Sequence, residues 1–349
     1  MTPSPLAASE PNFDHLVRMT DAHGTFEHAQ YAEPRPEHGY CTDDMARVLV
    51  VTTREPAAGP EVRELAALSL RFMTHAVSAG GGCRNRMSRR GRWEDRPTLN
   101  DCWGRSIWGF GTAVSHSDDE QFCRLATEQF ERAARQRSTW PRAMAFAALG
   151  AAEVLSVRPD NGVARALLTD AADAMAGSTE HTDRTRTRTW PWPEPRLTYA
   201  NAALPEAMIA AGVALERPGL LRQGLGLLEW LLDHEMQDGH VSVTPVGGAG
   251  PGDRGPGFDQ QPIEVAALAD ACARASRVDS DRRWPDGLSA AVAWFLGGND
   301  RGVVMWDPTT GGGFDGLEDG GANLNQGAES TLALLATLQH ARSLVAVLQ

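Results

Sequence analysis

Six segments of this 349-residue chain place acidic, amide, aromatic or arginine side chains at the start of an alanine- and glycine-rich stretch. They are Asp43-Asp44-Met45-Ala46-Arg47, Asp101-Cys102-Trp103-Gly104-Arg105, Trp140-Pro141-Arg142-Ala143, Tyr199-Ala200-Asn201-Ala202, Asp259-Gln260-Gln261-Pro262-Ile263-Glu264 and Asn325-Gln326-Gly327-Ala328-Glu329. Carboxylates can move protons at a glycosidic bond, while amides and guanidinium groups hydrogen-bond to sugar hydroxyls. The segments therefore predict an enzyme that acts on sugars, provided that the fold brings them to one pocket.

The first segment contains two adjacent carboxylates, Asp43 and Asp44, with Arg47 about one helical turn later. A helix N-terminus favours a capping carboxylate, but one aspartate is enough for that purpose. Asp101 repeats the pattern, because Arg105 follows it by four residues. For Asp101, a capping role and a role at the site are equally open.

Two further carboxylates, Glu264 and Glu329, fall in the first turn of stretches that we expect inside the fold. A carboxylate in that position is costly unless a cation pairs with it or its pKa is raised, and a general acid needs a raised pKa. A salt bridge to an arginine is the competing interpretation of Glu264. The predicted acid–base residues are Asp44, Glu264 and Glu329, with Asp43 and Asp101 as positioning carboxylates.

The other polar and aromatic side chains of these segments are predicted to bind the substrate. Aromatic rings at the mouth can stack on the apolar faces of sugars, although packing in the core is the alternative for each tryptophan. The predicted binding residues are His38, Tyr40, Arg47, Trp103, Arg105, Trp140, Arg142, Tyr199, Asn201, Asp259, Gln260, Gln261, Asn325 and Gln326. A run of five arginines from Arg84 to Arg92 is either a solvated face or a grip for an anionic group.

Composition excludes several kinds of chemistry. All 33 basic residues are arginine, so Schiff-base catalysis, a covalently held pyridoxal phosphate and the lysine of a phosphate-binding loop are impossible. The net charge of −12 argues against nucleic acid or an anionic membrane as a partner. The Asp- and Gly-rich segment after Asp307 lacks the acidic spacing of a calcium loop. We therefore predict neither a cofactor nor a metal.

The cysteines and the chain start indicate the compartment. Five scattered cysteines without a Cys-x-x-Cys spacing are typical of reduced thiols in a cytoplasmic protein. Residues 1–12 have neither a basic start nor an apolar stretch, so no secretory signal is expected, and no apolar run is long enough to span a membrane.

Apolar periodicity predicts about twelve helices. Their expected spans are 10–20, 42–54, 60–78, 101–116, 118–136, 140–157, 161–177, 199–216, 218–235, 261–277, 283–297 and 326–347. Links that follow the even-numbered helices are short, whereas links that follow the odd-numbered ones are long, with Ser138–Thr139 as the exception. Long ordered loops usually carry function, so we expect them all on one face.

The even-numbered helices are rich in small residues and have little polar surface, which suits an inner ring, while the odd ones carry charged faces. The sequence therefore predicts an all-α fold, an (α/α)6 barrel formed by one domain over residues 1–349, with 1–9 as a flexible tail. Short strands are expected in the rim loops near 239–244 and 302–306. The segment 182–189 is expected to be exposed.

Five motifs resemble a bacterial six-hairpin-glycosidase-like domain that is fused to, or encoded beside, family-4-type glycosyltransferases. They are Gly39–Arg47, Phe258–Glu264, Trp294–Asp300, Gly313–Leu317 and Asn323–Ser330. The resemblance spans nearly the whole chain and implies a six-hairpin barrel with a glycan substrate and a possible glycosyltransferase partner. Met45 and Ala200 depart from the family pattern, which leaves Glu194 as a secondary candidate acid.

The favoured interpretation is a glycoside hydrolase or phosphorylase of carbohydrate metabolism, with three alternatives. The first is a sugar epimerase or isomerase that uses His38 and His240 as proton shuttles. The second is a non-catalytic glycan-binding module that assists a glycosyltransferase. The third is a class II terpene cyclase, which would need an aspartate where this chain has Cys41.

Overall fold

The computed structural model describes residues 10–182, 190–253 and 255–348, and these ranges contain twelve α-helices. The even-numbered helices are α2 (Thr42–Thr53), α4 (Asp101–His116), α6 (Pro141–Val157), α8 (Ala203–Ala214), α10 (Pro262–Ala275) and α12 (Ala328–Leu348). The odd-numbered helices are α1 (Asp14–Arg18), α3 (Pro60–Ala76), α5 (Glu120–Ala133), α7 (Gly162–Thr182), α9 (Pro218–Glu235) and α11 (Arg283–Phe295).

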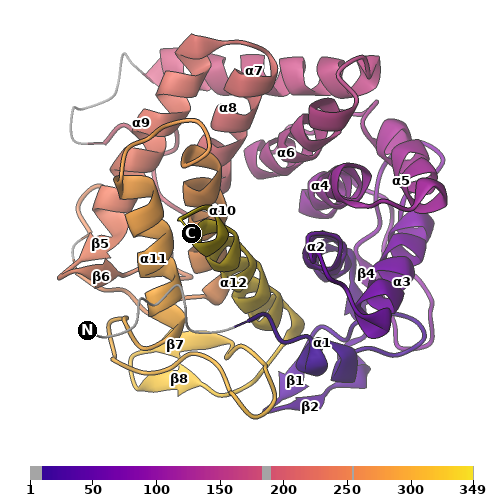
Figure 1. Ribbon diagram of the computed structural model, residues 1–349, viewed down its shortest axis with the longest axis horizontal. Helices are drawn as coiled ribbons and strands as arrows, with labels where there is room; N and C mark the ends of the chain where they lie inside the picture. Colours follow the sequence, from indigo (N-terminus) through magenta and orange to yellow (C-terminus); the bar gives the residue numbers. More distant parts are fainter. Residues whose placement is uncertain (1–9, 183–189, 254, 349) are drawn as a thin grey trace.

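The even-numbered helices close into a ring. Each packs against the next along the chain, and α12 packs against α2 to complete the circle (Figure 1). The odd-numbered helices α3, α5, α7, α9 and α11 each pack on the outside of the even-numbered helix before them. The predicted (α/α)6 barrel is therefore confirmed, and so is the prediction that the even-numbered helices lie inside.

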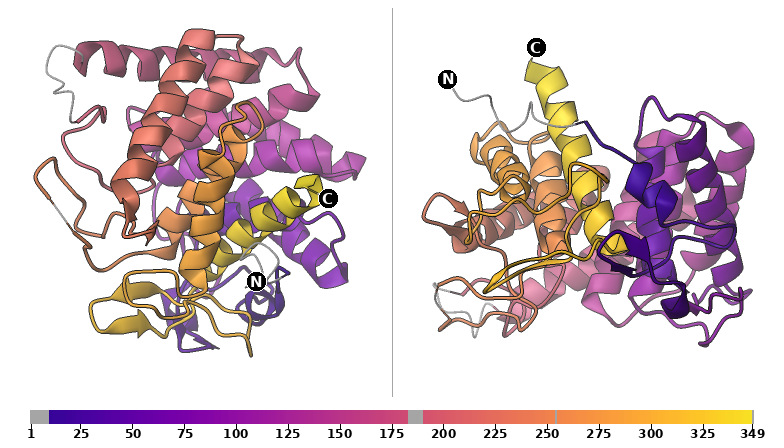
Figure 2. Two further views of the ribbon diagram at one scale, coloured as in Figure 1. Left: turned by 60° about the vertical axis from the view of Figure 1, so that its left-hand side comes forward. Right: turned by 90° about the horizontal axis from the view of Figure 1, so that it is seen from below.

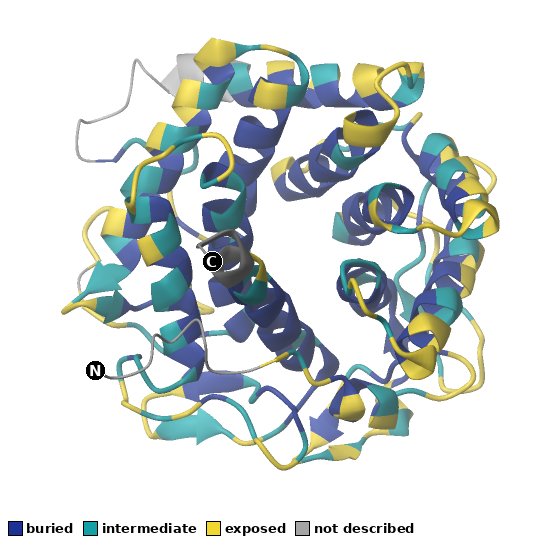
Figure 3. Ribbon diagram, in the orientation of Figure 1, coloured by how far each residue is buried: buried dark blue, intermediate teal, exposed yellow. Residues whose placement is uncertain are grey.

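Burial follows the same division. The inner helices are buried over most of their length, while the outer helices are buried inward and exposed outward (Figure 3). Small residues allow α4 and α6 to approach closely: a Cβ on Gly104 would lie 2.1 Å from the Ala143 carbonyl oxygen. A Cβ on Gly150 would lie 2.2 Å from the carbonyl oxygen of Ile107. The alanine and glycine content of the inner helices thus sets how tightly the ring closes.

Four two-stranded antiparallel sheets decorate the loops (Figure 2). They pair β1 (Ala29–Gln30) with β2 (Glu33–Pro34), β3 (Tyr40–Cys41) with β4 (Arg86–Met87), β5 (Met236–Gln237) with β6 (His240–Val241), and β7 (Gly316–Glu318) with β8 (Gly321–Asn323). The strand expected near 239–244 is present as β6. The segment 302–306 forms only isolated bridges, between Leu296 and Val304 and between Trp306 and Gly313. The segment 183–189 lies outside the described residues.

Most predicted helix boundaries are close to the observed ones, but the helix expected over 10–20 is only Asp14–Arg18 and the helix expected to end at 177 continues to Thr182. We expected a helix from residue 199, but α8 begins at Ala203. Ala200 has a left-handed backbone with φ of 45°, so it cannot belong to a right-handed helix. All five cysteines are free and buried, and among the described helices none is both long and apolar enough to cross a membrane.

Candidate active site

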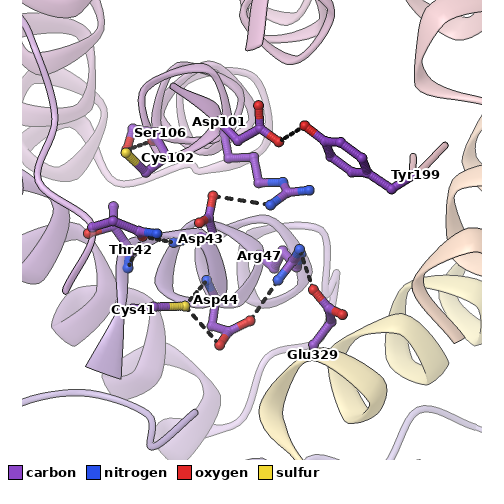
Figure 4. A network of polar contacts seen from close by, with 12 residues as sticks. Cys41, Thr42, Asp43, Asp44, Arg47, Asp101, Cys102, Ser106, Tyr199 and Glu329 are labelled. Carbon is purple, nitrogen blue, oxygen red and sulfur yellow. Dashed lines mark hydrogen bonds and ion pairs between the residues drawn. The ribbon is translucent and has the colours of Figure 1, made fainter. Parts of the chain in front are cut away.

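The first turns of the inner helices meet at one mouth of the barrel, where arginines connect carboxylates from different helices. The guanidinium group of Arg47 in α2 lies 2.6 Å from an Asp44 oxygen and 2.7 Å from a Glu329 oxygen at the start of α12 (Figure 4). Arg105 in α4 lies 3.1 Å from an Asp43 oxygen. Carboxylates that are far apart in sequence are therefore neighbours at the mouth.

The opposite side of the mouth is joined through the segment before α8. The Tyr199 hydroxyl donates to Asp101 at the start of α4 over 2.6 Å (Figure 4). Arg142 in α6 donates to the Tyr199 carbonyl at 2.8 Å, to Glu194 at 2.8 Å and to the Asn201 side chain at 3.2 Å. These bonds tie the starts of α4, α6 and α8 together.

Glu264 supplies the link to α10, but through backbone groups. Its two carboxylate oxygens accept the backbone N–H groups of Ala200 at 2.5 Å and Asn201 at 3.3 Å. This holds the left-handed turn at Ala200 that carries Tyr199 and Asn201 into the mouth. The salt bridge from Glu264 to Arg47, Arg105 or Arg142 that we considered is replaced by these two hydrogen bonds.

Two carboxyl groups at the mouth have raised pKa values. Burial raises the pKa of Asp44 to about 6, although the positive charge of Arg47 acts in the opposite direction. Burial also raises the pKa of Glu264 to about 7, against the hydrogen bonds from Ala200 and Asn201. Perturbed carboxyl pKa values are common at active sites, and they also occur in buried structural networks.

Exposure separates the carboxylates that a ligand can touch from those that it cannot. The side chain of Glu329 is 42% exposed and that of Asp43 is 16% exposed, whereas Asp44 is 3% exposed. Glu264 is also buried, and Asp101 is half-buried. Glu329, Asp43 and Asp101 can therefore contact a ligand directly, whereas Asp44 and Glu264 are buried.

The mouth leads into a small apolar space in the barrel. A cavity of about 40 Å³ lies beneath Arg47 and Arg105, and its walls include Trp108, Phe146 and Ala200. The Arg105 guanidinium carbon lies 4.7 Å from the centre of the Phe146 ring. Charged groups at the mouth are thus supported by apolar packing below, which holds them in fixed positions.

A second group beside Asp44 was not anticipated from the sequence. Ligand atoms of Glu27, Cys41 and Asp44 all lie within 4.8 Å of one another. Burial and the neighbouring Asp44 raise the pKa of the Cys41 thiol well above its usual value, and the thiol donates to Asp44 at 3.0 Å. Arg86 binds Glu27 and Arg47 binds Asp44, so a cation would displace two guanidinium groups. This set fits a hydrogen-bonding shell better than a metal site.

Eight predicted binding residues are buried. Arg47, Arg105, Arg142 and Asn201 are bonded within the mouth, whereas Trp103, Tyr40, Gln260 and Gln326 are bonded to other protein groups. Trp103 is fully buried and donates its indole N–H to the Ala133 carbonyl, so it offers no face to a sugar. Tyr40 is also fully buried, with its hydroxyl on Asp21. The side chains of Gln260 and Gln326 are buried among loop residues, where Gln260 donates to Asp300 and Gln326 accepts from Thr310. These four side chains bind other protein groups in this structure, and their role in ligand binding stays a prediction.

The other predicted residues lie around the rim. The side chain of Asn325 accepts the backbone N–H of Tyr31, and Trp140 is exposed at the start of α6. Gln261 precedes α10. Burial raises the pKa of Asp259 to about 6, and its carboxylate lies against Gly316. His38 lies edge-on to His28 with ring centres 4.9 Å apart, while His240 is hydrogen-bonded to Asp300.

Comparison with known proteins gives information on the fold. No family model matches the chain, and no curated protein matches it. A sugar epimerase from a ruminal bacterium is similar in structure, with a TM-score of 0.69, 13% identity and coverage of 98% of this chain and 96% of that one.

Two other solved structures share the architecture. A cellobiose 2-epimerase from Spirochaeta thermophila has a TM-score of 0.67 and 14% identity, and the match covers 99% of this chain and 97% of that one. A GH76 α-mannanase from Bacteroides thetaiotaomicron has a TM-score of 0.58 and 10% identity, with coverage of 88% and 87%. These likenesses support a six-hairpin glycosidase-like fold, and at such low identity they carry no activity over to this chain.

Proposed function

We propose that this protein is a carbohydrate-active enzyme that cleaves a glycosidic bond, by hydrolysis or phosphorolysis, at the mouth of the barrel. The proposal depends above all on Arg47, because one guanidinium group holds carboxylates from two inner helices at 2.6 and 2.7 Å. This bridge brings the start of α12 to the start of α2, the helix that also carries Asp43, and a glycosidase needs two carboxyl groups roughly 5 to 9.5 Å apart. Glu329 retains the exposed surface that a reacting group needs.

Glu329 and Asp43 are the proposed reacting carboxylates, since both are accessible and both face an arginine. One would protonate the departing glycosidic oxygen, and the other would accept a proton from water as its oxygen attacks the anomeric carbon. In phosphorolysis, inorganic phosphate would take the place of the water. Asp44 and Glu264 are proposed positioning residues: Asp44 orients Arg47, and Glu264 orients the segment that carries Tyr199.

The test is proton NMR in deuterated water, with and without inorganic phosphate. The panel should contain gluco-, manno- and galacto-configured oligosaccharides of both anomeric forms. New reducing-end signals support hydrolysis, and a sugar phosphate that forms only with phosphate present supports phosphorolysis. Deuterium incorporation into the sugar ring without bond cleavage would overturn the proposal.

That last outcome would select the second candidate, a sugar epimerase or isomerase. Its specific support is the pair formed by His28 and His38 at the rim, because imidazole is suited to proton transfer near neutral pH. Both side chains are accessible, at 48% and 36%, and His28 lies 3.8 Å from Glu27. Glu27 adjoins the Asp44 group, which brings this pair to the edge of the mouth.

A third outcome concerns the partner that the family resemblance implies. Binding without turnover, unaffected by Glu329→Gln, would indicate a module that presents a glycan to a glycosyltransferase. The same NMR samples distinguish this outcome, because line broadening of the sugar signals reports binding when no product appears.

A further inference from the structure

Three aromatic side chains stand out because they are exposed. Among the described tyrosines and tryptophans, Tyr31, Trp140 and Tyr199 are 62%, 59% and 46% exposed, while most of the others are buried. Single exposed apolar residues are ordinary. Here, however, all three belong to segments that contact or adjoin the mouth, so their distribution is informative.

Tyr31 is attached to the start of α12. Its backbone N–H donates to the Asn325 side chain at 2.9 Å, and its carbonyl accepts the Gln326 N–H at 2.9 Å. Its backbone is left-handed, with φ of 50°, a conformation that costs energy for tyrosine and suits glycine or asparagine. The chain therefore keeps an exposed ring at a position where a smaller residue would be more stable.

Trp140 and Tyr199 lie on the other side of the mouth. Trp140 is the residue before α6, two positions from Arg142. The Tyr199 ring lies beside the Arg142 guanidinium, 5.8 Å from its carbon, and its hydroxyl reaches Asp101 (Figure 4). The Tyr199 ring is thus fixed to Arg142 and Asp101, and Trp140 lines a pocket together with Glu194, which Arg142 binds.

The order of the inner helices around the barrel determines how far Tyr31, beside α12, lies from Trp140, before α6. In the sequence of contacts from α2 through α12, helix α6 lies opposite α12 (Figure 1). Neighbouring helix axes are about 8–10 Å apart, so opposite members of a six-helix ring are about 16–20 Å apart. A ligand that touches Tyr31 and Trp140 together must cross the mouth, where Arg47 binds Glu329 and Arg105 binds Asp43.

We infer that the ligand is an extended glycan of at least three linked sugar rings, which crosses the mouth from Tyr31 to Trp140. This inference rests on the proposed function and names its substrate class. Sugar rings would stack on aromatic platforms on both sides of the carboxylates, since apolar ring faces pack well against aromatic rings. The bond at the carboxylates is then an internal bond of the chain, and each cleavage gives two shorter glycans.

The test uses a glycan array graded in length from monosaccharides to hexasaccharides. Affinity should rise with length up to three or more rings. Tyr31→Asn should lower affinity for the longest bound glycan roughly twofold to tenfold, as expected for the loss of one ring contact. The same variant should keep its affinity for disaccharides and unfold at a higher temperature, because asparagine relieves the backbone strain. Trp140→Ala should also weaken binding of long glycans.

Val157→Ala is the matched control, because Val157 is also exposed, at 49%, but ends α6 at the opposite end of the barrel. Affinity that is already maximal for a monosaccharide or disaccharide would overturn the inference, as would unchanged long-glycan binding by Tyr31→Asn and Trp140→Ala. Absence of binding to every glycan longer than two rings would overturn it too. Cleavage without length dependence would refute the inference alone, whereas length-dependent binding without cleavage would refute the proposed function alone.

Discussion

The two ends of the barrel contain the same kinds of side chain in different states. At the mouth, Arg47 binds Glu329, whose side chain is still 42% exposed. At the opposite end, Arg54 binds Asp270 at 2.8 Å, and the Asp270 side chain is 9% exposed. A cavity of about 440 Å³ adjoins this second group. Space beside an arginine–carboxylate pair therefore does not by itself distinguish a reactive site from a structural one.

Helix direction explains much of the difference. The inner helices begin at the mouth, where the positive ends of their dipoles add to the arginines in stabilising carboxylates. They end at the other side, where the negative ends favour cations such as Arg54 and Arg274. There Arg274 binds both Glu153 and Glu206, so the carboxylates serve to neutralise buried arginines. The carboxylate of Glu329 at the mouth is more exposed than that of Asp270 at the opposite end, so it is more accessible to a ligand.

The largest effect should come from Glu329→Gln, which removes the accessible carboxylate of the mouth. We expect turnover of the glycan identified by NMR to fall roughly 10² to 10⁴-fold, the usual contribution of an acid or base. The free energy of unfolding should change by less than about 1 kcal/mol, because the ion pair is partly exposed. Initial rates and urea unfolding curves measure the two effects.

Asp173→Asn is the control for that comparison, because Asp173 is an arginine-paired carboxylate with a 62% exposed side chain on the outer helix α7. It should alter neither rate nor stability. Wild-type turnover by Glu329→Gln would exclude Glu329 as a reacting group and remove the contrast between the two ends.

At the opposite end, Asp270→Asn should act on stability alone. Asp270 accepts hydrogen bonds from Arg54 and His340, so its replacement leaves a buried guanidinium without its counter-charge. Breaking a buried ion pair typically costs about 3–5 kcal/mol. Urea unfolding should show this loss, while the KM of the folded fraction stays unchanged. A fall in turnover at normal stability would show that the two ends are functionally coupled.

The sequence alone was enough to predict the ring of inner helices, but not all of the side-chain contacts between them. Alternating link lengths and small-residue helices predicted which helices lie inside. The burial of Trp103 could also have been predicted from the sequence, because Trp103 shares one helix face with Ile107 and Phe110 at spacings of four and three. Ion pairs such as Arg54 with Asp270 could not be predicted from the sequence, since they depend on the register between helices more than 200 residues apart.

The mouth shows the same limit. The paired aspartates marked the start of α2. Arg86 belongs to the arginine run that the sequence showed, but its partner Glu27 lies in a segment without a motif, so this contact was not predicted. Glu264 was recognised as a buried acid, but its partners are backbone groups, which every residue possesses. Sequence pattern predicts which side chains face inward, and tertiary packing decides which of them remain accessible.

The pH dependence of stability should differ between Asp44 at the mouth and Glu153 at the opposite end. The pKa of Asp44 is raised to about 6, so its contribution is largest below pH 4 and is lost as the pH rises toward 6. The pKa of Glu153 is lowered to about 2, mainly by Arg274 against the effect of burial, so its contribution is present above pH 4.5 and is lost as the pH falls toward 2. Each shift corresponds to about 3 kcal/mol.

Urea titrations from pH 3 to pH 7 can separate these contributions. Asp44→Asn should flatten the loss of stability between pH 4 and 6, and Glu153→Gln should flatten the loss below pH 4.5. If the curve of stability against pH for either variant runs parallel to that of the wild type, the corresponding residue does not have the shifted pKa given above.

The smallest effect is expected from Tyr199→Phe, which removes one hydroxyl and keeps the ring. The hydroxyl donates to Asp101 in an exposed position, so its loss should cost about 0.5–1 kcal/mol of stability. Affinity for a long glycan should change less than twofold, because the ring remains beside Arg142. Tyr199→Ala removes the ring as well and should weaken that affinity further. Equal binding losses in the two variants would mean that the Tyr199–Asp101 hydrogen bond, and not the aromatic surface, is what the mouth requires.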